Sequence, residues 1–406
     1  MTYDRFVSVV RSAMEHACAT ARWAALAAVF AASLVQAGPL EVKVMTRNLY
    51  FGADLTPIFT ATPPNIPFAV AGAFANAVAT SPQERMARIA QEIFDAKPHI
   101  VGLQEAVLWR SQTPSNFVPA NPPNPPDAAT PEFGGAFTQQ IVGTLSGLGL
   151  SYSIHALKQS GDNELPGFNP ASPNFLTDYR LTDFDAILVR NDLPASKLKV
   201  LGAGSQTFAV NLTVPIGGAP VTIPHSYGYV DVQMSGIPFR VFNTHLDPSL
   251  GIVNELQAGE LIGAMNASPY RQIALGDFNT IADDGPTLTD EMILAAGFAD
   301  AWADKGVGPG FTWRDDELLN DMNVEFTQRL DYVFHRGGFQ TLGVELTGTV
   351  PFDSPPGGPP FWPSDHAGVL ATLQIVPEPG SLALFGLALA GIGLARGGAK
   401  KARPER

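Results

Sequence analysis

Six short polar segments of this 406-residue chain stand at the ends of apolar runs and together supply carboxylates, amides and imidazoles. They are Thr46-Arg47-Asn48-Leu49, Leu103-Gln104-Glu105, Asn243-Thr244-His245-Leu246, Gly276-Asp277-Phe278-Asn279, Arg329-Leu330-Asp331-Tyr332 and Ser364-Asp365-His366. Side chains of these types bind divalent cations, move protons and contact phosphate oxygens. Any one segment alone would be weak evidence, but the six in this order indicate metal-assisted hydrolysis of a phosphoester.

Two of the segments offer ligands for a hard cation. Glu105 follows the buried-strand pattern Ile100–Gln104, and Mg²⁺ prefers one or two carboxylates together with water and substrate phosphate oxygens. Asn48 ends the first strand and could contact a metal through its carbonyl or a phosphate through its amide. The structural alternatives are an exposed glutamate that begins a loop and an asparagine in a turn or cap.

Other segments hold groups suited to proton transfer. Alternation places Asp277 and Asn279 on one face, where a carboxylate could activate water and an amide could stabilise charge. An Asx-type turn is the alternative for this pair. A histidine acts best as acid or base when a carboxylate fixes its tautomer, which favours His366. A single histidine after a strand, such as His245, is more often structural.

Apolar runs predict the strands that position these groups, and helical spacing predicts the helices between them. The strands are Leu40–Thr46, His99–Leu103, Asp185–Val189, Phe239–Thr244, Arg271–Leu275, Leu330–His335 and Gly368–Ile375. Ser81-Pro82-Gln83-Glu84 predicts a capping box with proline at the first helical position, and Pro98 ends that helix. Phe137–Leu148 and Ile252–Met265 are predicted amphipathic helices.

The remaining stretches are predicted as a hairpin and three loops. The hairpin lies between Thr207 and Met234, with Gly217-Gly218 as its turn. Residues 52–80, 111–135 and 353–363 are irregular and proline-containing, and are expected to be surface loops. Helices that alternate with mixed strands indicate an α/β fold in which two packed sheets are covered by helices.

The six segments resemble those of the endonuclease/exonuclease/phosphatase superfamily, which has the DNase I-like fold. The resemblance covers nearly all of residues 41–375 and implies a four-layered α/β sandwich of two mixed β-sheets flanked by helices. Its members include nucleases, inositol polyphosphate phosphatases and bacterial sphingomyelinases. It therefore implies a metal-dependent hydrolase of phosphodiesters or phosphomonoesters that uses in-line attack by water.

The resemblance also implies individual roles. Metal binding, to Mg²⁺ or alternatively Mn²⁺ or Ca²⁺, falls to Asn48, Glu105 and Asp365, with Glu105 as the main ligand. The implied catalytic residues are His245, Asp277, Asn279, Asp331 and His366, of which Asp331 and His366 form a dyad. Asn243 would orient its neighbours, and Tyr179 and Arg180 are candidates for phosphate contact on a looser alignment.

Both ends of the chain read as targeting signals. Residues 1–37 contain a basic region, a short apolar run and the small-residue site Val35-Gln36-Ala37, which predicts a cleaved export signal rather than a membrane anchor. Residues 377–406 place Pro377-Glu378-Pro379 before an apolar span and a basic tail. This layout resembles the PEP-CTERM sorting signal of Gram-negative bacteria and implies transient membrane insertion, processing by an exosortase-type enzyme and delivery to the cell surface or extracellular matrix.

Between these ends, residues 38–376 are long enough for one large domain. The only cysteine, Cys18, lies in the export signal, so the mature protein would have no disulfide and no cysteine metal site. Without the two ends, 17 basic and 34 acidic residues remain, which changes the formal charge from −13 to −17. An acidic domain repels polyanions unless bound cations compensate, so no stable nucleic-acid complex is expected.

Two substrate classes stay open: extracellular nucleic acid, and lipid headgroups or small phosphoesters. The charge slightly favours the second, although the absence of an aromatic-tipped hairpin motif weakens assignment as a sphingomyelinase. A catalytically inactive surface or matrix scaffold with the same fold is the alternative from another class. The intact set of polar residues argues against that alternative.

Overall fold

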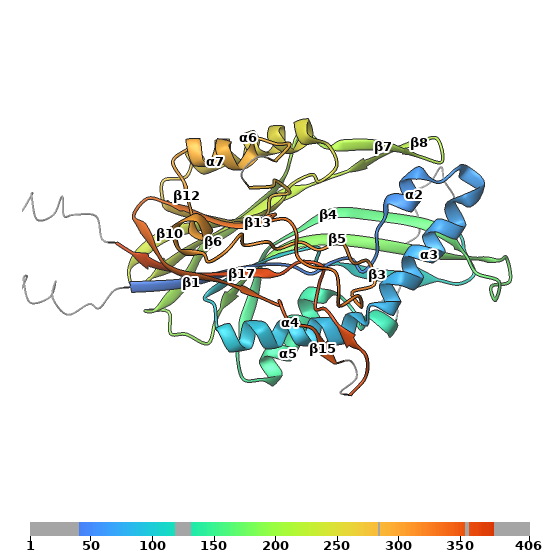
Figure 1. Cartoon of the computed structure of the whole chain (residues 1–406), viewed down its shortest axis with the longest axis horizontal. Coiled ribbons are helices and arrows are strands. Elements are labelled where there is room, and N and C mark those ends of the chain that lie inside the picture. Colours follow the sequence, from blue (N-terminus) through green and yellow to red (C-terminus); the bar gives the residue numbers. More distant parts are fainter. Residues whose placement is uncertain (1–39, 118–130, 283–284, 354–356, 377–406) are drawn as a thin grey trace, which may run out of the picture. The chain divides into compact units, whose positions relative to one another are not determined.

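A computed structural model describes residues 40–117, 131–282, 285–353 and 357–376 of the chain (Figure 1). The predicted export signal at 1–37 and the predicted sorting segment at 377–406 lie outside the described residues. Within the part of the chain that is described, no helix is long and apolar enough to cross a membrane.

The described residues build two mixed β-sheets. The first has the order β14 (Phe339–Thr347), β17 (Gly368–Ile375), β1 (Leu40–Asn48), β2 (Ile100–Gln104), β5 (Leu176–Arg190) and β3 (Leu108–Gln112), and β4 (Tyr152–Phe168) also pairs with β5. The second has the order β12 (Ala299–Asp300), β13 (Asp331–Arg336), β11 (Arg271–Asp277), β10 (Ile237–His245), β9 (Ser226–Met234) and β6 (Leu198–Thr207). Each predicted strand is found, although β5 begins well before the predicted Asp185 because its first half pairs with β3 and β4.

The two sheets pack face to face through side chains that alternate along the strands. A Cβ added at Gly102 of β2 would lie 2.0 Å from Leu275 Cδ1 and 2.4 Å from Asn243 Oδ1 of the second sheet. This contact identifies the inner faces, since alternation then turns Ile100 and its neighbours Val44 and Val189 the same way. All three side chains are essentially fully buried.

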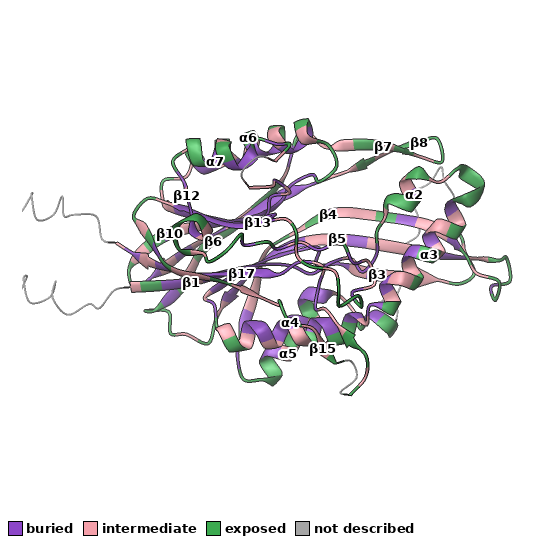
Figure 2. Cartoon of the chain, in the orientation of Figure 1, coloured by how far each residue is buried: buried purple, intermediate pink, exposed green. Residues whose placement is uncertain are grey.

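Helices cover the outer faces of both sheets, as Figures 1 and 2 show. Helices α4 (Pro82–Ala96) and α5 (Phe137–Gly147) pack on the first sheet, and α6 (Gly251–Asn266) and α7 (Thr289–Ala295) pack on the second. A short helix, α8 (Ala301–Lys305), follows β12. The result is the four-layered α/β sandwich that the resemblance implied, and the predicted fold class is confirmed.

The prediction that residues 52–80 form a loop is wrong. This segment contains α2 (Thr56–Thr60), the 3₁₀ turn η1 (Pro63–Asn65) and α3 (Ile66–Ala79). The prolines suggested a loop, but they occupy the first turns of these helices, where a missing N–H breaks no bond. Helix α3 is rich in alanine and apolar on most sides, so its sequence lacks the polar stripe that usually marks a surface helix.

The predicted capping box at Ser81 is also wrong, although α4 does begin at Pro82. Ser81 has a left-handed backbone with φ of 52° and makes no side-chain cap. It lies at the tight corner between α3 and α4, where the packing of the two helices sets its backbone conformation. At the third predicted loop, two short strands, β15 (Phe352–Asp353) and β16 (Pro360–Phe361), pair with each other.

The predicted hairpin is confirmed and stands apart from both sheets. Its strands are β7 (Leu212–Ile216) and β8 (Ala219–Ile223), which are inserted between β6 and β9. Gly217 and Gly218 have φ of 61° and 87°, the positive values that a two-residue hairpin turn requires. In Figure 1 this hairpin reaches toward α2 and away from the helices of the second sheet.

Candidate active site

Strand register explains how the polar segments meet. In the second sheet, β10 and β11 run parallel with His245 opposite Asp277, and β13 places Asp331 opposite Asp277 on the other side. In the first sheet, β1 and β2 run parallel with Asn48 opposite Gln104, so Glu105 follows directly at the same edge. The carboxyl ends of β10, β11, β1 and β2, together with the amino end of the antiparallel β13, thus bring these groups to one end of the sandwich.

The side chain of Asn48 connects the two sheets within the site. Its amide nitrogen donates to Glu105 Oε1 at 2.9 Å and to Asp277 Oδ2 at 3.0 Å, while its carbonyl accepts from the backbone N–H of Tyr50 at 2.9 Å. Of the two roles left open by the sequence, this arrangement turns the donor half of Asn48 toward the carboxylates. Both acids are therefore held by one neutral donor.

Glu105 lies immediately beyond β2 in a left-handed conformation, with φ of 53°. Such a backbone is costly for a residue with a side chain and is often found at functional sites. Its Oε2 accepts from the backbone N–H of Phe51 at 2.8 Å. Burial, followed by the nearby charge of Asp365, raises the pKa of Glu105 to about 8.

Asp277 is the centre of the group. Its Oδ1 accepts from the backbone N–H of Asn279 at 3.0 Å, and Asn279 has φ of 46° and donates its amide to Leu246 O at 2.8 Å. The Asx-type turn considered from the sequence is therefore present, and both side chains also line the cavity. Burial raises the pKa of Asp277 to about 7.

His366 and Asp331 make the dyad that the resemblance implied. Nδ1 of His366 lies 2.8 Å from Asp331 Oδ2, and Nε2 of the same ring lies 3.7 Å from Asp277 Oδ2. Burial by itself would lower the pKa of His366, but the carboxylates of Asp331, Asp365 and Asp277 raise it well above the ordinary value. These carboxylates therefore favour the charged form of the His366 imidazole.

His245 approaches Asp277 from the other side, with its Nε2 3.7 Å from Asp277 Oδ2. Here burial, followed by the neighbouring His225 and His366, lowers the pKa well below the ordinary value. The Asp277 carboxylate therefore faces one imidazole whose pKa is raised and another whose pKa is lowered. Pairs of titratable groups driven apart in this way indicate separate acid and base roles.

Sequence reasoning missed a second pair behind His245. Nδ1 of His225 lies 3.1 Å from the backbone carbonyl of His245, and His225 Nε2 lies 3.8 Å from Asp247 Oδ2. Asp247 lies in the loop after β10, is buried, and its Oδ2 has no hydrogen-bond partner among the described residues. The pairing of β9 with β10 is what reveals this contact, because Ser226, which follows His225, lies opposite His245 in that antiparallel pair.

Buried arginines hold the loops that carry the site. Nη1 of Arg85 donates to Leu49 O at 2.7 Å and to Pro363 O at 3.2 Å, and Nη2 donates to Tyr50 O at 3.2 Å. Arg47 donates to the backbone carbonyl of His366 and pairs with Glu92 at 3.3 Å. These bonds fix the segment after β1 against the segment before β17.

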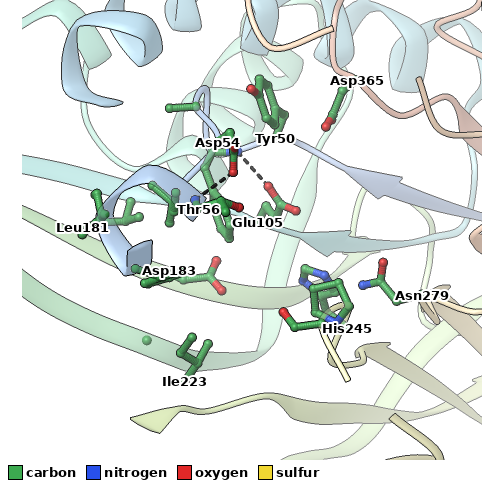
Figure 3. A pocket seen from close by; sticks show the side chains of 18 of the residues that line it. Tyr50, Asp54, Thr56, Glu105, Leu181, Asp183, Ile223, His245, Asn279 and Asp365 are labelled. Atoms are coloured by element: carbon green, nitrogen blue, oxygen red, sulfur yellow. Dashed lines mark hydrogen bonds between the residues drawn. The ribbon is translucent and has the colours of Figure 1, made fainter. Parts of the chain in front are cut away.

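Most of the grouped residues line a cavity of about 660 Å³, a size typical of small-molecule sites, although Asn48 and Asp331 are not among its lining residues. Figure 3 shows Glu105, Asp365, His245 and Asn279 around it, together with the carboxylate of Asp183. Asp183 was not anticipated from the sequence, and burial, followed by Asp185 and Glu105, raises its pKa well above the usual range. Asp365 is likewise shifted upward in pKa by burial.

Three residues considered for substrate binding differ in position. Tyr179 lines the cavity and stacks on Phe74 with 4.1 Å between ring centroids. Arg180, the next residue of β5, points to the opposite face and its Nε donates to Asp162 at 2.6 Å. The structure does not bring Arg180 to the cavity.

Asn243 also lies away from the cavity, between the two sheets. Its amide donates to Leu103 O at 3.0 Å and to Ala186 O at 3.1 Å, and its Oδ1 accepts from Gln104 at 2.5 Å. It therefore bonds the second sheet to two strands of the first, a role that its place beside His245 in the sequence did not reveal.

The donor set fits a divalent cation. Asp277, Asp331 and His366 offer ligand atoms within 4.8 Å of one another. Glu105 and Asp365 lie in the same cavity, and their raised pKa values report buried negative charge that lacks compensation. A hard cation with carboxylate ligands would supply that compensation.

Comparisons with known proteins agree with this geometry. The sequence model described as "Endonuclease/Exonuclease/phosphatase family" matches residues 48–366, and the PEP-CTERM protein-sorting motif matches residues 376–397. No curated protein matches the chain. The chain belongs to the endonuclease/exonuclease/phosphatase family, a class of hydrolases that act on phosphoester bonds, and it carries a sorting signal that indicates export.

Solved structures share the fold at low identity. An endonuclease/exonuclease/phosphatase family protein from Bacteroides thetaiotaomicron is 17% identical, with 83% of this chain and 98% of that chain covered and a TM-score of 0.52. A mannosyl-6-phosphatase from Bacteroides thetaiotaomicron VPI-5482 is 18% identical, with 82% and 99% covered and a TM-score of 0.50. These likenesses support the DNase I-like fold and carry no information on substrate.

Proposed function

We propose that the protein is an exported, Mg²⁺-dependent phosphoesterase that hydrolyses its substrate in one step by in-line attack of water. The observation that carries this proposal is the pair of histidines with opposite pKa shifts on either side of Asp277. A charged His366 can donate a proton or stabilise developing negative charge, whereas a neutral His245 can donate from its N–H without adding a cation.

Glu105 is the proposed main ligand of the cation, with Asp365 nearby and Asn48 holding the Glu105 carboxylate in place. When bound, the cation would polarise the phosphoryl oxygen and stabilise charge on the leaving group. Asn48 donates to both Glu105 and Asp277, so the distance between ligand and catalytic carboxylate is fixed by the protein itself.

Asp277 and the Asp331–His366 dyad are proposed to activate the attacking water, with the dyad orienting it. Asp331 holds the proton of His366 on Nδ1 and leaves Nε2 toward Asp277 and the cavity. Asn279 and His245, which line the same cavity, would stabilise the pentavalent transition state. We assign the proton to Asp277 when His366 is charged, because a charged imidazole cannot accept it.

Processing of the exported chain by an exosortase-type enzyme, with transient insertion of residues 377–406 in a membrane, is part of the same proposal. Delivery to the cell surface or the extracellular matrix would follow. The sorting motif at 376–397 supports it.

The test is hydrolysis of a substrate panel by the purified protein with Mg²⁺, with Mn²⁺ or Ca²⁺ in its place, and with chelator. The panel contains duplex DNA, RNA, sphingomyelin, an inositol phosphate and an aryl phosphodiester. We expect chelator-sensitive turnover that falls at least about 100-fold in His366→Ala and Glu105→Gln. Matched controls are His155→Ala and Glu345→Gln, whose side chains lie outside the cavity.

Turnover that survives chelation, or that His366→Ala leaves intact, would overturn the proposed mechanism. A folded protein with no turnover on the whole panel would favour the inactive scaffold.

A further inference from the structure

The cavity has two chemically different halves. One half is the catalytic group around Asp277. The other is lined by aliphatic side chains from α2, α3, the long strands β4 and β5, and the β7–β8 hairpin, namely Ile58, Val70, Leu165, Leu181, Ile216 and Ile223. In Figure 3, Leu181 and Ile223 lie along the same cavity as Glu105 and His245. A ligand that reaches the catalytic group can therefore contact the aliphatic half at the same time.

The hairpin supplies one wall because of its alternation. Ile216 and Ile223 are partly buried and line the cavity, whereas Thr213 and Thr222, which are paired with each other and alternate with the cavity-side positions, are exposed. The turn is anchored at its tip: a Cβ at Gly217 would lie 3.1 Å from Ile66 Cδ1 of α3. The hairpin belongs to neither of the two large sheets, and its apolar face forms part of the wall of the cavity that also contains the catalytic group.

Charge at the cavity opposes a substrate with many phosphates. Among the described residues that line it, Arg314 is the only lysine or arginine, and its Nη2 is paired with Asp316 Oδ2 at 3.1 Å. Further carboxylates, such as Asp54 and Asp315, line the same space. One cation can neutralise one phosphate, but additional phosphates along a polymer would meet uncompensated negative charge.

We propose that the aliphatic half binds an alkyl chain, and that the substrate is a phosphoester with a single phosphate and an aliphatic substituent. This rests on the proposed function and adds the substrate class. In the reaction, the oxygen of water bonds to phosphorus, the bond from phosphorus to the leaving oxygen breaks, and the departing alcohol takes a proton. The chain in the aliphatic half fixes the phosphate against the catalytic group during this exchange.

The experiment measures binding of alkylphosphonates by calorimetry to the Mg²⁺-loaded protein, with methyl-, butyl- and hexylphosphonate as probes. Each buried methylene can improve affinity by up to about four-fold, and we expect hexylphosphonate to bind at least about tenfold more tightly than methylphosphonate. Ile223→Ser should remove most of that ratio and leave methylphosphonate affinity unchanged. Ile216→Ser is a second variant of the same kind at the other strand of the hairpin.

Thr222→Ser is the matched control, because Thr222 precedes Ile223 on the same strand, is exposed and does not line the cavity. It should retain the full ratio between hexyl- and methylphosphonate. Equal affinity for all chain lengths in the wild-type protein, or equal losses in Thr222→Ser and Ile223→Ser, would overturn the inference. Either result would leave the proposed function standing if methylphosphonate still binds with Mg²⁺. Failure of every phosphonate to bind, together with no turnover, would count against both the alkyl site and the proposed function.

Discussion

Replacement of Asp331 by asparagine tests the dyad with the least change of shape. Asp331 is buried, its Oδ2 holds His366 Nδ1 at 2.8 Å, and its backbone N–H is fixed by Thr312 Oγ1 at 3.2 Å. Asp331→Asn keeps this position but removes the charge. It also places a neutral amide against Nδ1, which can stabilise the wrong tautomer of His366.

The expected loss follows from what Asp331 supplies. Proton transfer by a positioned side chain contributes about 10²- to 10⁴-fold, or about 3 to 5 kcal/mol of barrier. We expect kcat to fall within that range while KM changes little, since Asp331 lies behind His366 and contacts no substrate. Asp331 also raises the pKa of His366, so the alkaline limb that reports loss of the imidazolium should move to lower pH.

The assay is the pH profile of kcat for the wild-type protein and Asp331→Asn, with chemical denaturation to confirm folding. Asp300→Asn is the matched control, because Asp300 is also buried and paired, but with Arg329 and the backbone N–H of Trp302 rather than with a histidine of the site. If kcat of Asp331→Asn stays within threefold of wild type, or if Asp300→Asn loses as much activity, the dyad does not act as argued.

Two further predictions concern stability. Gly102→Ala should cost about 1–3 kcal/mol in unfolding free energy, because the new Cβ would overlap Leu275 Cδ1 and Asn243 Oδ1 between the sheets; urea unfolding measures it, and Gly143→Ala on α5, which meets open space, should show no loss. His99 accepts a hydrogen bond from the backbone N–H of Lys43 at 2.9 Å, and burial, followed by Arg190 and Lys43, lowers its pKa to about 4. Because the pKa of His99 is lowered in the folded state, the neutral ring stabilises the fold above about pH 6.5, and this contribution is lost as pH falls toward 4. The wild-type protein should therefore lose roughly 2–3 kcal/mol more unfolding free energy between about pH 6.5 and pH 4 than His99→Asn does. Equal pH dependence in the two proteins would contradict this account.

The sequence predicted the parts of the molecule that depend on local pattern. The strands and the polar residues at their ends followed from apolar runs, and the Gly217-Gly218 turn followed from the conformation that only glycine adopts easily. Helix α3 was missed because its alanine-rich composition has no clear polar face and its prolines suggested a loop. Ser81 was misassigned because the corner between two helices, set by their packing, decided its conformation.

Roles that depend on contacts between distant segments could not be read from the chain. Asn243 alternates with His245 along β10, but only the packing of the two sheets shows that it bonds the backbone of β2 and β5. His225 is a comparable case, since its partners His245 and Asp247 belong to a different segment of the chain. Arg180 is another, since it bonds Asp162 on the face of β5 that does not meet the cavity. Periodicity predicts which face a side chain occupies and does not identify what it meets there.

The place of β17 in the first sheet has a consequence for how activity arises during synthesis. This strand begins two residues after His366 and lies between β14 and β1, so the last strand of the domain is the immediate neighbour of the first. A nascent chain that has not yet delivered it lacks an interior strand of that sheet, beside which the His366 imidazole is placed. Under the proposed mechanism, hydrolysis therefore cannot begin on a partly made domain, and the appearance of catalytic capacity coincides with closure of the sandwich.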